Sequence, residues 1–173
     1  MLRLPVLQLP NCSRTADHQL PTSAEPVTIQ VPARLGAELQ SLAREHGCDL
    51  FQLMFACWAL MLCRESGQEE VVVGYMYHGR DAVGLDQLIG FFAIPLCVRV
   101  DVPKDQTFVS YIQAVKSIMV DAMANAKWPM QLFGSNDLLP HLGREWSADA
   151  VFQTRFLWET DGGWLSNATD EVI

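Results

Sequence analysis

The sequence predicts an α/β domain in which strands and helices alternate along the chain. Apolar residues recur at helical spacing in several segments, and runs with strand character lie between those segments. Composition agrees, because 50% of the 173 residues are apolar, which is enough for one domain with a buried core.

The first predicted elements are a strand and an amphipathic helix. Val27–Val31 alternates with a period of two, which is typical of a strand. From Pro32 the period becomes helical, with leucines and Ala43 on one face and Gly47 as the stop signal. The preceding residues 1–26 are rich in proline and predict an extended lead-in segment without its own core.

A more apolar helix and three further elements follow. The helix Asp49–Glu65 is apolar on nearly all sides, which is typical of a buried helix. The unbroken run Val71–Val73 indicates a strand inside the sheet. The stretch Leu88–Val102, LIGFFAIPLCVRVDV, predicts a strand of about ten residues. Thr107 is suited to cap a long helix, and Ala150–Trp158 alternates as a last strand.

Charge and apolar patterning exclude several classes of protein. The formal net charge is −8 and no basic stripe is present, so nucleic acid is not expected as a partner. The longest apolar run, Leu53–Cys63, has about half of the roughly 20 residues that span a bilayer. Pro5 and Pro10 interrupt the apolar leader, which argues against a signal peptide.

Five cysteines without a C-x-x-C pair indicate buried thiols in a reducing compartment. We therefore expect a cytoplasmic protein without a membrane partner.

The common catalytic signatures are absent, so single residues must be weighed one by one. His78 follows a strand and is either a base at the strand end or an isolated, solvated histidine. Arg80 and Asp81 form either a substrate clamp or a solvated turn with a local ion pair, and the turn is favoured. Trp58 and Trp158 are predicted in the core. Three tryptophans fall in loops and suggest a contact surface: Trp128, Trp146 and Trp164.

Several stretches resemble the condensation domain of nonribosomal peptide synthetases. LAREHGCDLFQLMFACWALMLCRESGQEEVVVG is similar to the helix, helix and strand segment of that family. IGFFAIPLCVR resembles the family motif I-G-x-F-V-N-T-L-x-x-R, with identities at Ile89, Gly90, Phe92, Leu96 and Arg99. Ile94 and Pro95 replace the Asn-Thr pair, and two later family motifs survive only in reduced form.

This resemblance implies the fold: a two-layer sandwich of a mixed sheet with packed helices, as in one lobe of a chloramphenicol-acetyltransferase-like protein. The implied organisation is a lead-in segment at 1–26, a partial C-terminal lobe at 27–160 and an acidic tail at 161–173. The family motif H-H-x-x-x-D-G, whose second histidine serves amide formation, does not occur. We therefore expect a truncated domain with no catalytic residue and no metal site.

The resemblance also implies where substrates would lie. In the family, the strand that contains the I-G-x-F motif runs beside the channel where two carrier-bound substrates meet. The candidates for lining this channel are Arg80, Gly90, Phe91, Phe92 and Arg99. No cofactor is expected to be bound, but the phosphopantetheine arms of partner carrier proteins would enter the channel.

Three hypotheses of function follow. The chain supplies half of a condensation tunnel and pairs with a synthetase lobe carrying H-H-x-x-x-D-G; or it is a non-catalytic module that docks a synthetase or a peptidyl carrier protein; or it is a remnant. An orphaned lobe is expected to expose an apolar patch, which self-association into a homo-oligomer would cover.

Overall fold

The computed structural model describes residues 4–10, 26–126 and 151–159. Within these ranges the elements are α1 (Ala33–Glu45), α2 (Leu50–Ser66), β1 (Glu70–Tyr77), the 3-10 helix η1 (Leu85–Gln87), β2 (Ile94–Asp101), α3 (Phe108–Ala124) and β3 (Thr154–Phe156). The loop tryptophans, most residues of the two later motif remnants and the acidic tail lie outside the described residues, whereas Asn125, Phe152 and Gln153 of those remnants are described.

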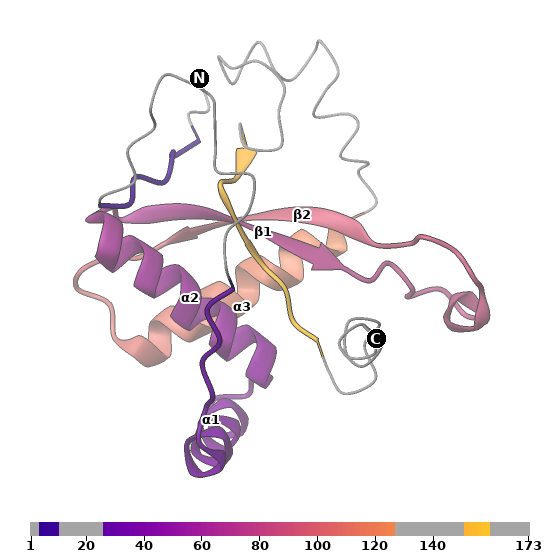
Figure 1. Cartoon of the computed structure of the whole chain (residues 1–173), viewed down its shortest axis with the longest axis horizontal. Helices are drawn as coiled ribbons and strands as arrows, with labels where there is room; N and C mark the ends of the chain where they lie inside the picture. Colours follow the sequence, from indigo (N-terminus) through magenta and orange to yellow (C-terminus); the bar gives the residue numbers. More distant parts are fainter. Residues whose placement is uncertain (1–3, 11–25, 127–150, 160–173) are drawn as a thin grey trace.

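The described strands form a mixed sheet with the order β2, β1, β3. β1 runs antiparallel to β2, with Val73 opposite Val98, and parallel to β3, with Val73 opposite Thr154. β1 therefore has a neighbour on both sides, which confirms the interior position that its valine run predicted. Figure 1 shows β1 and β2 as the two long strands of this sheet.

Helices α2 and α3 cover one face of the sheet and make the second layer (Figure 1). The inward valines of β1 and β2 pack in one core cluster with buried side chains of both helices, including Phe55 of α2 and Ile112 of α3. The hydroxyl group of Tyr111 donates to the carbonyl oxygen of Ala56 at 2.9 Å and so ties α3 to α2. The predicted two-layer α/β sandwich is thus confirmed.

The helix ends follow from local sequence. Asp49 and Gln52 form a capping box at the start of α2, in which each side chain accepts a hydrogen bond from the other residue's backbone N–H. Gly67 ends α2 in the left-handed conformation with φ 69°. Thr107 Oγ1 accepts from the Ser110 N–H at the start of α3, as its position predicted.

The second face of the sheet is covered by distant parts of the chain. Val72 packs with Val151 and Phe152 in a separate buried cluster, against which Leu4 also lies. A Cβ atom on Gly74 would stand 2.6 Å from the Phe152 ring, so a side chain at this position would displace the ring. Residues 4–10 are also fixed by polar contacts. For example, the Leu7 N–H donates to Gln153 Oε1 at 2.9 Å.

One predicted strand is absent, and two are present but shorter than predicted. Val27–Val31 forms no strand, because no described strand lies beside it; the side chain of Val27 is 88% exposed. The last strand covers only Thr154–Phe156. The stretch before Ile94 is a loop, so β2 has eight residues.

The two described tryptophans have different outcomes. Trp58 packs against the main core, as predicted. Trp158 was also predicted in the core, but it lies just past the end of β3 and is 39% exposed. Its ring stacks on Phe156, with centroids 6.4 Å apart. Its ring also contacts Phe51 of α2, with centroids 6.3 Å apart, but this packing leaves it partly exposed.

No single described helix is long and apolar enough to cross a bilayer. The pair α1 and α2 meets the length and composition requirement only jointly, and the two helices are bent by 101° relative to each other.

Candidate functional site

The candidate site is the connection between β1 and β2, residues 78–93, which we call the Arg80 loop. It contains Arg80, Gly90, Phe91 and Phe92, four of the five residues that the resemblance implied for a substrate channel. In Figure 1 this loop projects beyond the end of the two long strands, at the right. The topology therefore brings these four candidates together in one protruding segment.

Arg99, the fifth candidate, lies elsewhere. It pairs with Val72 in the sheet register, near the start of β1, whereas the Arg80 loop follows the end of β1. Its guanidinium group forms an ion pair with Glu70 and lies 3.9 Å from Asp101. Arg99 is thus part of a cross-strand charge cluster at the opposite end of the sheet, and the structure does not join it to the other candidates.

Arg80 organises the loop that carries it. Its guanidinium group donates to the carbonyl oxygens of Leu85, Leu88 (2.9 Å) and Gly90 (3.1 Å). The same group lies over the ring of Phe92, 4.4 Å from the centroid, in a cation–π contact. The predicted Arg80–Asp81 ion pair is not seen, because the guanidinium group contacts three backbone carbonyls and one ring instead.

Two glycines allow this close packing. Gly79 has φ +66°, and a Cβ atom there would lie 2.1 Å from the carbonyl oxygen of Phe92. A Cβ atom on Gly90 would lie 2.9 Å from the Phe92 ring. Only glycine fits at either position without a shift of the neighbouring atoms of the loop.

A polar cluster joins the end of β1 to the first residues of the Arg80 loop. The buried Tyr77 donates its hydroxyl hydrogen bond to the carboxylate of Asp81. This hydrogen bond, together with burial, raises the pKa of Tyr77 to about 12. The sequence analysis did not identify Tyr77 as a site residue. An inward-facing tyrosine at the end of a strand does not indicate that its hydroxyl group will bond to Asp81, four residues later.

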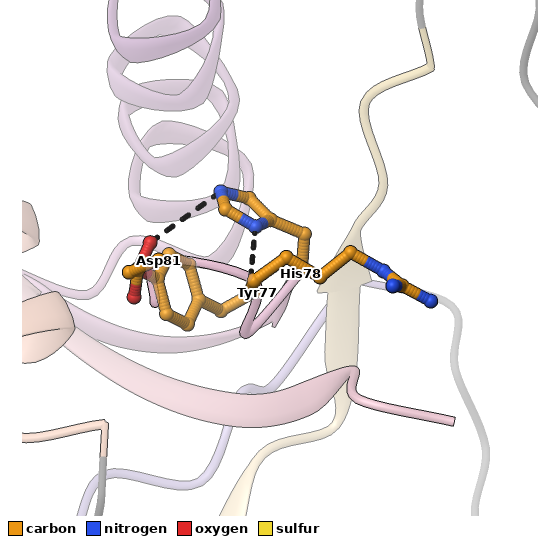
Figure 2. Close-up of polar contacts among 4 residues, drawn as sticks. Tyr77, His78 and Asp81 are labelled. Atoms are coloured by element: carbon orange, nitrogen blue, oxygen red, sulfur yellow. Dashed lines mark hydrogen bonds and ion pairs between the residues drawn. The ribbon is translucent and has the colours of Figure 1, made fainter. Parts of the chain in front are cut away.

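His78 and Asp81 face each other in this cluster (Figure 2). His78 Nε2 lies 3.9 Å from Asp81 Oδ1, and His78 Nδ1 accepts the Arg80 backbone N–H at 3.0 Å. The accepting Nδ1 carries no proton, so the neutral ring holds its proton on Nε2, toward the carboxylate. Nε2 lies beyond hydrogen-bond distance of the carboxylate and the His78 side chain is 62% exposed, so the geometry favours the solvated interpretation of His78.

The outer surface of the Arg80 loop is apolar. Val83 and Ile89 are fully exposed, Phe91 is 87% exposed and Leu88 is 53% exposed. We call these four exposed side chains the apolar patch, because large apolar side chains gathered on a surface are typical of interaction sites. Large apolar side chains are therefore exposed on a loop whose backbone Arg80 holds in place.

The described residues offer little for covalent or metal chemistry. No group of three or more His, Cys, Asp and Glu side chains within them is arranged to hold a metal ion. The four described cysteines are free thiols. Burial raises the pKa of Cys63 and of Cys97 to about 11, so both thiols stay protonated and are poor nucleophiles.

The family model of the condensation domain matches residues 2–167, which is nearly the whole chain. The chain belongs to the condensation domain family. The resemblance inferred from the IGFF and SGQEEVVVG stretches is thereby confirmed.

Curated relatives are long synthetases. The chain is 30% identical to bacitracin synthase 1 of Bacillus licheniformis over 132 residues, covering 74% of this chain and 2% of the relative. It is 28% identical to malpibaldin synthetase of Mortierella alpina over 135 residues, covering 78% of this chain and 2% of the relative. The condensation-domain chain thus spans only a small part of each of these synthetases.

Solved structures share the fold. The condensation domain from the Monacolin K polyketide synthase MokA aligns with a TM-score of 0.64 and 21% identity, over 92% of this chain and 34% of that one. The four-domain nonribosomal peptide synthetase holo-AB3403 aligns with a TM-score of 0.68 and 20% identity, over 78% of this chain and 10% of that one. The two-layer sandwich is thus a lobe of the condensation-domain fold.

Proposed function

We propose that this condensation-domain chain forms one wall of a tunnel for amide formation in nonribosomal peptide biosynthesis. Family membership carries the proposal. The proposed partners are a lobe carrying H-H-x-x-x-D-G and the peptidyl carrier proteins whose phosphopantetheine arms deliver the substrates. In this role the protein works in the cytoplasm.

The proposed reaction is the attack of a carrier-bound amine on a carrier-bound thioester. The new C–N bond replaces the C–S bond, the amine loses a proton, and the released thiol gains one. Holding two tethered groups together contributes up to about 7–11 kcal/mol in well-oriented cases, so a lobe without a catalytic histidine still matters. The Arg80 loop supports this role, because the hydrogen bonds of Arg80 fix the backbone of the segment that carries four of the proposed channel residues.

His78 is not assigned the base of this reaction. Its Nδ1 accepts a backbone hydrogen bond and its Nε2 lies 3.9 Å from Asp81, and we assign the proton acceptor to the partner lobe. This division of labour matches the absence of H-H-x-x-x-D-G from the printed sequence.

The second candidate function is a non-catalytic docking module. The exposed patch of Val83, Leu88, Ile89 and Phe91 favours it, because such a surface needs a partner whether or not chemistry follows. A homo-oligomer is one way in which the patch would be covered.

A reconstitution assay tests the tunnel proposal. Carriers loaded with aminoacyl thioesters are mixed with this chain alone, with a first lobe from the bacitracin synthase relative, and with both. The proposal expects amide product only with both chains. It expects His78→Ala to leave the rate unchanged, whereas an alanine at the second histidine of the partner's motif abolishes it.

Two results would contradict the tunnel role. Turnover by this chain alone that is lost in His78→Ala would place the base here. Stable binding of the first lobe with no product in any combination would favour the docking module instead.

A further inference from the structure

A cavity of about 390 Å³ lies at the end of the sheet opposite the Arg80 loop, where β1 begins and β2 ends. Its walls come from the end of α2, the loop before β1, the end of β2 and the start of α3. Its volume falls within the range of small-molecule sites in proteins. Nothing in the proposed condensation role uses this cavity.

The apolar part of the lining consists of Leu60, Cys63, Val102, Phe108 and Tyr111. Cys63 and Tyr111 are buried, and Leu60 and Val102 are half-buried. The Tyr111 hydroxyl donates to the Ala56 carbonyl, and the Cys63 thiol stays protonated, so neither offers a charged contact to a ligand. This surface is suited to an apolar group rather than to a sugar or a nucleotide base.

The rim of the cavity adds positive charge. Arg64, in the last turn of α2, has no hydrogen-bond or ion-pair partner within the described residues. Lys104 and Glu69 also line the cavity, but they neutralise each other in an ion pair of 2.8 Å. One uncompensated cation therefore stands beside an apolar floor.

We propose that this cavity binds an amphipathic monoanion: a single carboxylate, held by Arg64, on an aliphatic or aromatic body that rests on the apolar floor. The Lys104–Glu69 pair adds no net charge, so Arg64 matches one carboxylate and a second negative charge on the ligand would have no partner cation. Fork geometry makes the arginine side chain a good partner for one carboxylate.

The experiment titrates the full chain with octanoate. Octan-1-ol is the uncharged comparison ligand with the same chain length, and acetate is the comparison ligand that has the carboxylate but no long apolar chain. Amide chemical shifts in ¹⁵N NMR spectra are followed during each titration. Octanoate is expected to shift the amides of Gly67 and Gln68 in a saturable way. Octan-1-ol is expected to bind about fivefold more weakly, because an exposed ion pair contributes up to about that factor, and acetate not at all.

Arg64→Gln provides the decisive variant, and Arg44→Gln is its matched control. Both arginines lie in the last turn of a helix, but only Arg64 lines the cavity. Octanoate affinity should fall about fivefold in Arg64→Gln and stay unchanged in Arg44→Gln. Equal affinity for octanoate and octan-1-ol, no saturable shift, or shifts confined to the Arg80 loop would each overturn the proposal.

Discussion

The guanidinium group of Arg80 lies 4.4 Å from the centre of the Phe92 ring, twelve residues later in the chain. Its hydrogen bonds to the Leu88 and Gly90 carbonyls hold the backbone between these two side chains. One side chain thus folds a loop that has an apolar exterior and little core of its own. The loop is rigid at its base and presents its apolar residues outward.

The first prediction concerns this contact. Arg80→Gln should destabilise the protein by about 1 kcal/mol, since it removes hydrogen bonds from a charged donor and a cation–π contact. Amide hydrogen exchange at Leu88, whose N–H is bonded to Leu85 within the loop, should accelerate. Arg34→Gln is the control, because Arg34 is 90% exposed and pairs only with Glu38. Equal exchange in both variants would show that Arg80 does not order the loop.

A second prediction tests the packing of Phe152 on β1. Gly74→Ala should destabilise the protein by about 1–3 kcal/mol, because its Cβ atom would stand 2.6 Å from the Phe152 ring. Gly36→Ala in α1, where nothing lies within 4 Å, should instead stabilise it by about 0.5–1 kcal/mol. Thermal unfolding compares the two variants.

The cause of the Gly74 effect can be isolated with a double-mutant cycle. If the ring is the obstacle, Gly74→Ala should cost less in a Phe152→Ala background than in the natural chain. Strictly additive losses would place the strain elsewhere.

The third prediction is a pH dependence at alkaline pH. The pKa of Tyr77 is about 12 in the folded protein, above its usual value of 10.0. Between these values the folded state holds a proton that the unfolded state has lost, so the free energy of unfolding must decrease as the pH rises through this window. Tyr77→Phe should flatten this decrease.

Denaturant unfolding at several alkaline pH values measures the slope. Tyr75 and Tyr111 also have raised pKa values, mainly through burial, so the slope should be reduced in Tyr77→Phe but not removed. An unchanged slope would mean that the hydrogen bond to Asp81 does not favour the protonated phenol.

The fourth prediction concerns the apolar patch. Ile89→Ser combined with Phe91→Ser should lower self-association and weaken binding of a first lobe, with little change in the free energy of unfolding, because both side chains are exposed. Val27→Ser combined with Ile29→Ser is the matched control, since these residues are also exposed but lie far along the chain. Light scattering and binding titrations report the result. Identical behaviour of the two double variants would remove the patch from the proposed interface.

The sequence by itself determined the family and the helices of this protein. The Asp49 and Gln52 side chains, Gly67 and Thr107 set the helix ends through contacts within a few residues, and such contacts are encoded locally. The valine run of β1 indicated an interior strand, because its residues face apolar layers on both sides.

Tertiary structure alone decided the remaining features. Val27–Val31 has the period of a strand, but a strand exists only where another strand supplies hydrogen bonds, and no described strand lies beside it. The sequence placed Arg80 in a loop, but it did not identify the three carbonyl groups that accept its hydrogen bonds. Every backbone carbonyl can accept a hydrogen bond, and only the folded structure determines which ones lie close to the guanidinium group. Arg99 matched the same family motif as Gly90, yet the sheet register carries it to the opposite end of β1, where Glu70 is its partner.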